Sequence, residues 1–263
     1  MQLNDYIRVS EALFYKHERT EKLPPNVYSM HTHNLFELLY FVEGDATCVI
    51  EDRKYKMRPH DLVLIRPYLH HFVQIDTVTD YERYDILFSD KTKNISGLEL
   101  LDGVPEVINL EEYSMATEII KKTDFYSRHF SGEDFEKILT SLLSELFYLL
   151  SVTPRTSKTD DATVSSQTLS RALSYINDNL TTLSGVEEVA RKCFVTESYL
   201  FRLFKSELKQ TPLKYITSKR LLLAERMISD NERPTVVYEK CGFSDYTTFY
   251  RNYRSYFGHS PSA

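Results

Sequence analysis

Two stretches near the C-terminus resemble each other and restrict the fold more than any other feature of the 263-residue sequence. They are VARKCFVTESYLFRLFK (189–205) and VYEKCGFSDYTTFYRNYR (237–254). In each stretch a short helical segment ends in Lys-Cys, and a tight turn leads to a Thr or Ser that is followed by an acid and a second helical segment. A short helix, a turn of three or four residues and a second helix form a helix-turn-helix. The sequence therefore predicts two such motifs in one chain.

The spacing of matched residues defines the relation between the copies. Cys193 and Cys241 are 48 residues apart, whereas Arg202 and Arg251 are 49 apart, so the second copy carries one inserted residue. Thr211-Pro212 opens a helix between the copies that we expect to run for about 17 residues, or about 26 Å. Second helices held at that distance can reach successive major-groove segments on one face of DNA, roughly 34 Å apart.

The second helix of each copy has a buried face and a polar face. We expect Thr196 and Ser244 to cap these two helices, and Ser184 with Glu187 to form a capping box before the first motif. A capped helix start presents free N–H groups and partial positive charge, which suit a phosphate backbone. The residues predicted to face DNA are Ser198, Phe201, Arg202 and Lys205 in the first motif and Tyr246, Thr247, Tyr250, Arg251 and Arg254 in the second.

Charge is divided unevenly along the chain, whose formal net charge is −6. Residues 166–263 contain 14 Lys/Arg and 10 Asp/Glu, a net of +4, while residues 1–165 contain 18 and 28, a net of −10. Such a division indicates different partners for the two halves. The basic half fits double-stranded DNA.

The polar run TPRTSKTDDATVSSQ (153–167) contains almost nothing to bury and is typical of a linker. Before it, residues 26–88 contain short β-branched and aromatic runs, which we expect to be strands at 36–44, 46–53, 61–67, 70–76 and 81–88. From 111 to 152 the apolar spacing is helical, with leucines on a wide stripe. We expect this stripe to pack on the sheet and part of it to form a homodimer.

The segment EKCGFSDYTTFYRNYRSYFGHSP resembles the signature of the AraC/XylS family of transcription regulators, and residues 166–263 resemble the family's DNA-binding domain. The resemblance implies that Ser198, Arg202, Tyr246, Thr247 and Arg251 face bases, and that Thr248 and Arg254 lie nearer phosphates. The sequence departs from the family at Lys209, where a Gly usually follows the first recognition helix, and at Tyr238, where a small Ala is usual. It also ends soon after Ser260-Pro261.

Near the N-terminus, HTHNLFELLYFVEG (31–44) fits H-x-H-x3-E-x6-G, the first motif of cupin barrels. His31, His33, Glu37 and His71 would make a nitrogen and oxygen ligand set for Fe, Mn, Ni or Zn. The family resemblance favours instead a barrel that binds a small effector without metal, so we expect no cofactor and no catalytic residue. A sugar is the effector class that the resemblance suggests, although Arg66 would equally admit an acid. The predicted effector residues are His31, His33, Glu37, Tyr40, Arg66, Tyr68 and His71.

These features predict two domains and a function. We expect an all-β cupin-like barrel with a helical dimerisation segment (1–152), a linker (153–165) and an all-α double helix-turn-helix domain (166–263). The predicted function is sequence-specific transcription regulation in response to a small molecule, with RNA polymerase as a further partner. A metal-dependent cupin enzyme with an appended helical domain is the alternative, and a DNA-architectural protein without a sensor is a third.

The location of the protein follows from what the sequence lacks. No run approaches 18 apolar residues, and the N-terminus shows no basic and apolar signal pattern. Three widely spaced cysteines fit reduced core thiols better than disulfides. The sequence thus predicts a cytoplasmic protein with no membrane partner.

Overall fold

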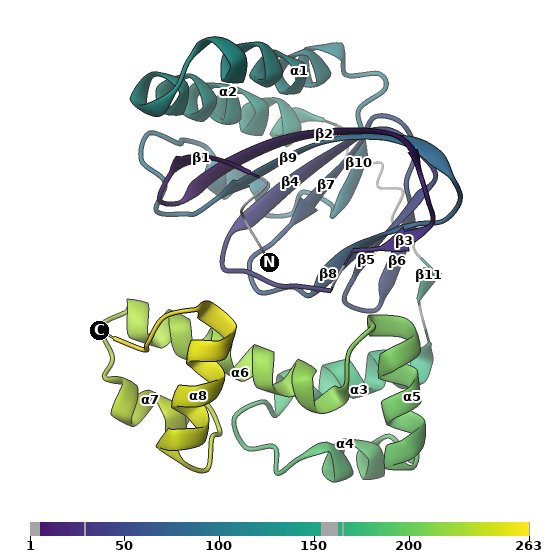
Figure 1. Cartoon of the computed structure of the whole chain (residues 1–263), viewed down its shortest axis with the longest axis vertical. Coiled ribbons are helices and arrows are strands. Elements are labelled where there is room, and N and C mark those ends of the chain that lie inside the picture. Colours follow the sequence, from purple (N-terminus) through teal and green to yellow (C-terminus); the bar gives the residue numbers. More distant parts are fainter. Residues whose placement is uncertain (1–5, 29, 154–162, 165, 263) are drawn as a thin grey trace. The chain divides into compact units, whose positions relative to one another are not determined.

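The computed structural model describes residues 6–28, 30–153, 163–164 and 166–262. The chain divides into two compact units, Met1–Thr163 and Val164–Ala263 (Figure 1). Most of the predicted linker, 153–165, lies outside the described residues, which include only Thr153, Thr163 and Val164 of that segment. Within the described residues no helix is both long enough and apolar enough to span a membrane.

The first unit contains two β-sheets and two long helices. One sheet has the order β1-β2-β9-β4-β7-β10 and the other the order β11-β6-β5-β8-β3. The strands are β1 (Ile7–Ser10), β2 (Leu13–Leu23), β3 (Asn26–Val27), β4 (Phe36–Glu43), β5 (Ala46–Ile50), β6 (Arg53–Lys56), β7 (Asp61–Ile65), β8 (His71–Ile75), β9 (Thr79–Phe88), β10 (Val107–Asn109) and β11 (Thr163–Val164). A 3-10 turn, η2 (Leu98–Leu101), precedes β10.

All five strands expected between residues 36 and 88 are present, as β4, β5, β7, β8 and β9. The strand β2 was not predicted, because after its apolar start the stretch Lys16–Lys22 is almost entirely polar or charged. Its register with β9 places Lys16 beside Asp85 and Glu18 beside Arg83, so charged residues of opposite sign pair across the two strands. Because the inward-facing residues of β2 are charged, its sequence lacks the alternation of apolar and polar residues that indicates a strand.

The two faces of β4 point into different layers. Leu38 and Tyr40 pack in the cluster that contains the helices α1 (Ser114–His129) and α2 (Gly132–Val152), whereas Leu39 and Phe41 pack with residues of the second sheet. Figure 1 shows α1 and α2 lying over the six-stranded sheet. The predicted leucine stripe of α2 is buried there, which confirms that it packs on the sheet. Each such side chain contributes about 1.5–3 kcal/mol by burial.

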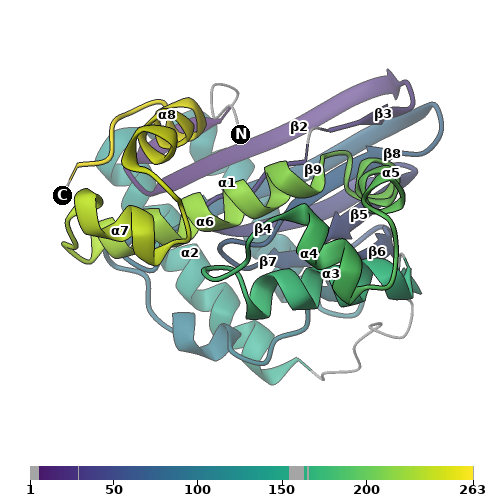
Figure 2. The ribbon, with the colours of Figure 1, turned by 90° about the horizontal axis from the view of Figure 1, so that it is seen from below.

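The second unit is all helical, and a long central helix joins two small bundles. Its elements are α3 (Gln167–Asp178), α4 (Val186–Lys192), α5 (Glu197–Leu208), α6 (Pro212–Ser229), α7 (Pro234–Lys240) and α8 (Tyr246–Phe257). The helix α6 packs against α5 on one side and against α7 and α8 on the other, as Figure 2 shows. The described structure therefore contains two helix-turn-helix motifs, α4–α5 and α7–α8, as the repeat predicts.

Backbone hydrogen bonds in the two turns match residue by residue. Cys193 N donates to Val189 O at 2.9 Å, and Cys241 N donates to Val237 O at 2.9 Å. The bond two residues later also recurs, from Val195 to Ala190 and from Phe243 to Tyr238, each at 3.0 Å. The offset is still 48 at this point and becomes 49 at the helix caps. Ser244 is therefore the inserted residue.

Two of the predicted caps are wrong by one residue. The N-cap of α8 is Asp245, whose Oδ1 accepts from Thr248 N at 2.7 Å, and not Ser244. Before the first motif, Ser184 N and Oγ donate to Glu188 rather than to Glu187, and the N-cap residue of α4 is Gly185. Thr196 caps α5 as expected, and Thr211 caps α6.

Candidate nucleic-acid interface and effector site

The helices α5 and α8 are held down by matched apolar residues. Leu200 and Phe204 of α5 are fully buried, and Phe249 and Tyr253 occupy the corresponding positions of α8. Between the members of each pair, Arg202 and Arg251 are exposed. The two motifs thus present one arginine each at the same place on an equally anchored helix, which is the arrangement expected of paired recognition helices.

Most of the residues predicted to face DNA are exposed. Those exposed are Ser198, Phe201, Arg202, Lys205, Thr247, Arg251 and Arg254, whereas Tyr246, Thr248 and Tyr250 are partly buried. We expected Tyr246 and Tyr250 to be exposed, and this prediction is wrong, because both side chains are partly buried. Tyr246 packs edge-on against Tyr238, with ring centroids 5.8 Å apart, and lies 6.2 Å from Tyr250. Tyr238, which replaces the usual small residue, thus supports the start of the recognition helix.

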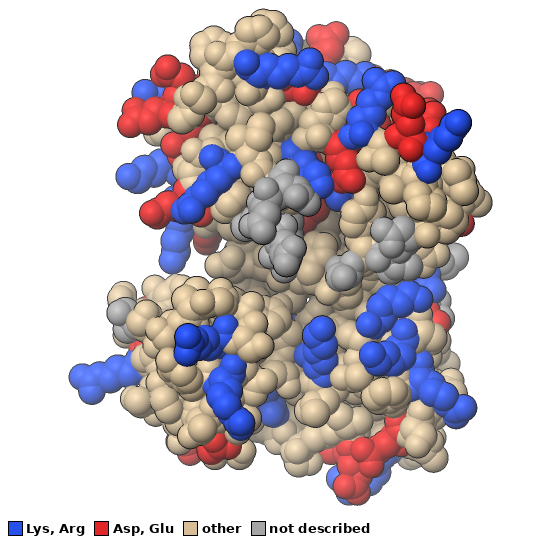
Figure 3. All heavy atoms as spheres, in the orientation of Figure 1, with Lys and Arg blue, Asp and Glu red and all other residues tan. Residues whose placement is uncertain are grey.

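The start of α8 carries an acidic cap, which alters its electrostatics. A hydrogen bond from the Thr248 backbone lowers the pKa of Asp245, so the carboxylate is charged at neutral pH. It offsets the partial positive charge that a helix start otherwise offers to phosphate. The positive charge of α8 therefore comes from the exposed side chains of Arg251 and Arg254. The basic side chains visible on this unit in Figure 3 fit its net charge of +4.

A joint between the two bundles restrains the relative position of the motifs. From α6, Arg220 Nε donates to Leu180 O at 2.9 Å and Nη2 donates to Leu183 O at 2.6 Å. In the second turn, Gly242 has a φ of +84°, and a Cβ built there would lie 2.6 Å from Thr181 O. The loop that follows α3 is thereby clamped to α6 and to the turn of the second motif. The 18 residues of α6 span about 27 Å between the motifs.

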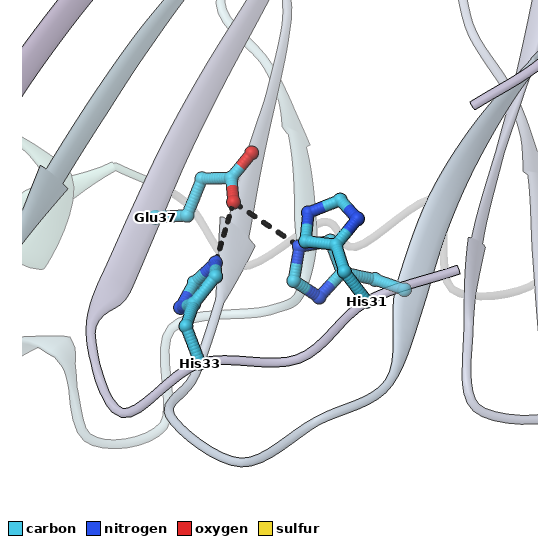
Figure 4. Close-up of side chains that lie close together, drawn as sticks. His31, His33 and Glu37 are labelled. Atoms are coloured by element: carbon cyan, nitrogen blue, oxygen red, sulfur yellow. Dashed lines mark hydrogen bonds and ion pairs between the residues drawn. The ribbon is translucent and has the colours of Figure 1, made fainter. Parts of the chain in front are cut away.

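In the first unit, four of the predicted effector residues come together. His31, His33, Glu37 and His71 each offer a ligand atom, and all of these atoms lie within 4.8 Å of one another. Glu37 Oε2 lies 2.9 Å from His33 Nε2 and 3.1 Å from His71 Nε2. Figure 4 shows the Glu37 carboxylate pointing toward the ring of His33, with His31 nearby. A backbone bridge between His31 and His71 joins the two segments.

Burial and mutual attraction shape the charge of this cluster. Burial alone would raise the pKa of Glu37, but the charge of His71 and hydrogen bonds with both imidazoles hold this pKa well below its usual range. Burial works to lower the pKa of His71, and the neighbouring Glu37 carboxylate raises it above its usual range. For His33 burial dominates and lowers the pKa. The cluster therefore holds an ionised carboxylate.

Two of the other three predicted effector residues, Tyr40 and Arg66, lie away from this cluster. Tyr40 points from the opposite face of β4, into the layer with the helices, and its hydroxyl lies 2.8 Å from His60 Nδ1. Arg66 donates to Leu101 O and Val104 O, so it anchors the segment after η2. Neither Tyr40 nor Arg66 lines the space around Glu37, so the structure contradicts the predicted position of both side chains. Tyr68 N donates to His33 O at 2.8 Å, which brings that backbone beside the cluster.

Sequence reasoning missed a second polar group on the inward face of β2 and β9. Arg83 lies 3.0 Å from Asp85 Oδ2 and 3.3 Å from Glu18 Oε2, and Tyr28 donates to Glu18 at 2.9 Å. Burial raises the pKa of Asp85 to about 7, although Arg83 acts to lower it. Asp85 Oδ1 is buried and makes no hydrogen bond within the described residues. The signal was present in YERYDILF, where Arg and Asp two residues apart share a face with Tyr81.

Comparisons with known proteins match each unit to a family. Residues 19–92 match the family model for the AraC-like ligand binding domain, and residues 189–263 match that for a helix-turn-helix domain. The uncharacterized HTH-type transcriptional regulator YfiF of Bacillus subtilis (strain 168) is 24% identical over 245 residues, covering 88% of this chain and 77% of that protein. Both units therefore have counterparts, in the same chain, in a relative of similar organisation.

Two further relatives match over shorter stretches. The probable transcriptional regulator LumQ of Photobacterium leiognathi is 35% identical over 89 residues, which is 34% of this chain and 36% of that protein. The raffinose operon transcriptional regulatory protein RafR of Pediococcus pentosaceus is 29% identical over 126 residues, covering 48% of this chain and 46% of that protein. The matches thus span less than half the length of these two relatives.

Proposed function

This chain belongs to the AraC family of transcriptional regulators, and we propose that it binds a specific DNA sequence and regulates transcription in response to a small-molecule effector. The observation that carries the proposal is the matched pair of exposed arginines, Arg202 and Arg251, each set on a helix anchored by the same two buried positions. The relatives are transcriptional regulators, and catalysis has no part in the proposal.

The proposed DNA contacts are those that the sequence suggested. Arg202 and Arg251 read base edges, for which arginine's bidentate fork suits guanine. Ser198, Thr247 and Tyr246 complete the base-facing set, while Thr248 and Arg254 lie nearer phosphates. The restrained distance between α5 and α8 favours two half-sites on one face of the duplex. Such binding takes place where the chromosome lies, which we expect to be the cytoplasm.

The proposed effector site is the inward face of the six-stranded sheet. Two polar groups share this face, the cluster around Glu37 and the buried Arg83–Asp85 pair. Hydroxyl or carboxylate groups of a small metabolite can satisfy such side chains, and a buried acceptor without a partner, such as Asp85 Oδ1, favours a hydrogen-bond donor. A sugar fits this chemistry, and one relative is named for a raffinose operon.

We further propose that residues 111–152 form a homodimer. The outer surfaces of α1 and α2 expose large apolar side chains, among them Met115, Phe125, Tyr148 and Val152. A groove of about 200 Å³ lies between the start of α1 and the end of α2, and Met115, Leu149 and Val152 help to line it. Exposed apolar surface of this kind is typical of an interface. The effector would act by favouring one arrangement of the DNA-binding units over another, and so their contact with RNA polymerase.

Fluorescence anisotropy with the full chain tests the proposed function. We expect binding to DNA from the chain's own upstream intergenic region to exceed binding to scrambled DNA by about a thousandfold, with affinity falling steeply as salt rises. Arg251→Ala should weaken specific binding by about 1–3 kcal/mol and relax the sequence preference.

The matched control is Arg226→Ala, because Arg226 is an exposed arginine of the same unit that lies on α6, outside both recognition helices. It should leave the ratio of specific to scrambled binding unchanged. Equal affinity of the wild-type chain for both DNAs would contradict the proposal, as would equal losses from the two substitutions.

A further inference from the structure

We infer that Phe201 reads a thymine in the first of the two DNA half-sites, through contact between its ring and the 5-methyl group of the base. The inference rests on the proposed DNA binding and deepens it, because the base-facing residues proposed above all carry hydrogen-bonding groups. It gives the first motif a requirement for thymine that the second motif does not share.

Phe201 lies on the face of α5 that also carries the basic side chains. Ser198, Phe201, Arg202 and Lys205 are spaced i, i+3, i+4 and i+7, so they share one side of the helix. The Phe201 side chain is 48% exposed there. An exposed ring beside positive charge suits a partner that offers both phosphate groups and an apolar group, and the major groove of DNA offers both.

The second motif shows how this position differs from its neighbours. At the offset of 49 residues, the three polar positions of the α5 face correspond to Thr247, Arg251 and Arg254, so each keeps its hydrogen-bonding chemistry. Phe201 corresponds to Tyr250, which adds a hydroxyl group and is partly buried. The first motif therefore offers an exposed ring without a polar group where the second motif offers a partly buried phenol.

The chemistry of the major groove selects one base for this ring. The edges of guanine, adenine and cytosine present hydrogen-bond donors and acceptors, whereas thymine presents a methyl group beside its acceptor. A phenyl ring pressed against a donor or acceptor removes its water and returns no hydrogen bond, which costs free energy. Against the thymine methyl group the same ring buries apolar surface of both partners. Phe201 thus favours thymine by contact and disfavours the other bases by desolvation.

Apolar surface continues beside Phe201. A groove of about 530 Å³ is lined by Phe201 and Ser198, together with Val186 from the start of α4 and Pro212 and Leu213 from the start of α6. The Leu213 side chain is 61% exposed. Because two residues of the proposed DNA-facing side line this groove, it opens next to the proposed interface. A methyl group placed against Phe201 is therefore close to further apolar atoms.

Selection from a duplex library with randomised bases, followed by sequencing, tests the inference with the full chain. We expect the wild type to enrich sites with thymine at one position of one half-site, besides the guanines that the arginines read. Phe201→Ala should keep the guanine positions and lose the preference for thymine. Because the Phe201 side chain is about half exposed, this substitution should leave the helical circular dichroism unchanged.

A change in the DNA alone isolates the methyl group. Replacing the selected thymine by deoxyuridine removes that group and leaves every hydrogen-bonding atom of the base in place. Fluorescence anisotropy should show about fourfold weaker binding by the wild type, as expected for one buried methyl group, and unchanged binding by Phe201→Ala. The matched control is Tyr199→Ala, because Tyr199 is an exposed aromatic residue of α5 that lies off the shared face. It should respond to deoxyuridine as the wild type does.

The outcomes separate this inference from the proposed function. Enriched sites with no thymine position that depends on Phe201 would overturn the inference and leave sequence-specific DNA binding intact. Equal affinity of the wild type for the thymine and deoxyuridine duplexes would do the same. An equal loss by the wild type and Phe201→Ala on deoxyuridine would also overturn it, because another residue would then contact the methyl group. A library in which no sequence is enriched would overturn both the inference and the proposed function.

Discussion

At the scale of the residue, the first helix-turn-helix differs from the second at one backbone position. Phe194 and Gly242 occupy the same place in the two turns, directly after the matched cysteines, and both have positive φ, +58° and +84°. Glycine adopts this conformation freely, whereas a residue with a Cβ is strained there. The Phe194 side chain is 89% exposed and gains little from packing. The first turn is therefore strained without compensation.

Phe194→Gly should stabilise the second unit by about 0.5–1 kcal/mol, because relief of the strained backbone exceeds the added entropy of the unfolded chain. Urea unfolding followed by helical circular dichroism measures the change. Tyr199→Gly is the matched control, because Tyr199 is also exposed and aromatic but lies within α5, where glycine should cost about 1 kcal/mol. A loss of stability in both variants would show that the Phe194 ring packs on its surroundings.

Individual side chains were the hardest features to predict from the sequence. Glu37 and Tyr40 were both expected around the effector, yet they lie three residues apart on one strand and so point to opposite faces. The sequence alone shows that Glu37 and Tyr40 cannot both face the effector. The sequence does not show the role of Arg66, because the carbonyl groups of Leu101 and Val104 that accept its hydrogen bonds lie more than thirty residues away. Ser and Asp are both favourable N-cap residues, so the sequence does not choose between Ser244 and Asp245. The structure shows that Ser244 is the inserted residue and that Asp245 corresponds to the cap Thr196.

At the scale of the element, α6 and its joint restrain the separation of the two motifs. Arg220 holds the loop after α3, and the same loop touches the turn of the second motif at Gly242. A side chain at 242 would need to displace Thr181 O or the Arg220 guanidinium. The joint thus depends on a residue without a Cβ as well as on a positive φ.

Gly242→Ala should therefore destabilise the second unit by about 2–3 kcal/mol, through backbone strain and through the clash with Thr181 O. It should also weaken binding to DNA that carries both half-sites more than binding to either half-site alone. Chemical unfolding and anisotropy on the three DNAs measure both effects.

Gly258→Ala provides the control for strain alone, since Gly258 has a φ of +80° but no atom within 4 Å of a built Cβ. It should cost about 1 kcal/mol and leave DNA binding unchanged. Equal effects of the two substitutions would mean that the contact with Thr181 does not restrain the motifs.

Elements with a strong local signal were predicted well. The five strands from β4 to β9 that alternate or are continuously apolar were all expected, and so were α2 and the helices of both motifs. The strand β2 was missed because Lys16 and Glu18 point inward toward charges on β9. Pairing of that kind depends on a strand more than sixty residues away, so it leaves no local pattern.

At the scale of the whole molecule, two units of opposite net charge share one chain. The family resemblance, drawn from the motif at the C-terminus, is confirmed by the family matches to both halves. The cupin motif grouped His31, His33, Glu37 and His71 from the sequence, and the structure brings these four side chains together. What the sequence did not show is the backbone bridge between His31 and His71, which forms only in the folded sheet.

Separating the units should separate their activities. A chain ending at residue 160 should lose DNA binding and keep its dimer and its affinity for small molecules, because both recognition helices lie beyond that point. Anisotropy and analytical ultracentrifugation measure the two properties. The complementary chain 161–263 should bind the specific DNA with a weaker preference for paired sites. DNA binding by the fragment that ends at residue 160 would contradict the assignment of DNA binding to the second unit.

The length of α6 fixes the distance and the rotation between α5 and α8, because α6 connects the two motifs and Arg220 holds it to the loop after α3. Each residue added to or removed from it would turn one recognition helix by about 100° relative to the other and shift it by about 1.5 Å. In the proposed binding to two half-sites, the DNA duplex cannot follow such a rotation, so a change in the length of α6 should require a matching change in the spacing of the half-sites. We expect related proteins to tolerate insertions and deletions outside the α6 segment, Pro212–Ser229. Within this segment we expect the number of residues to match the distance between the half-sites on DNA.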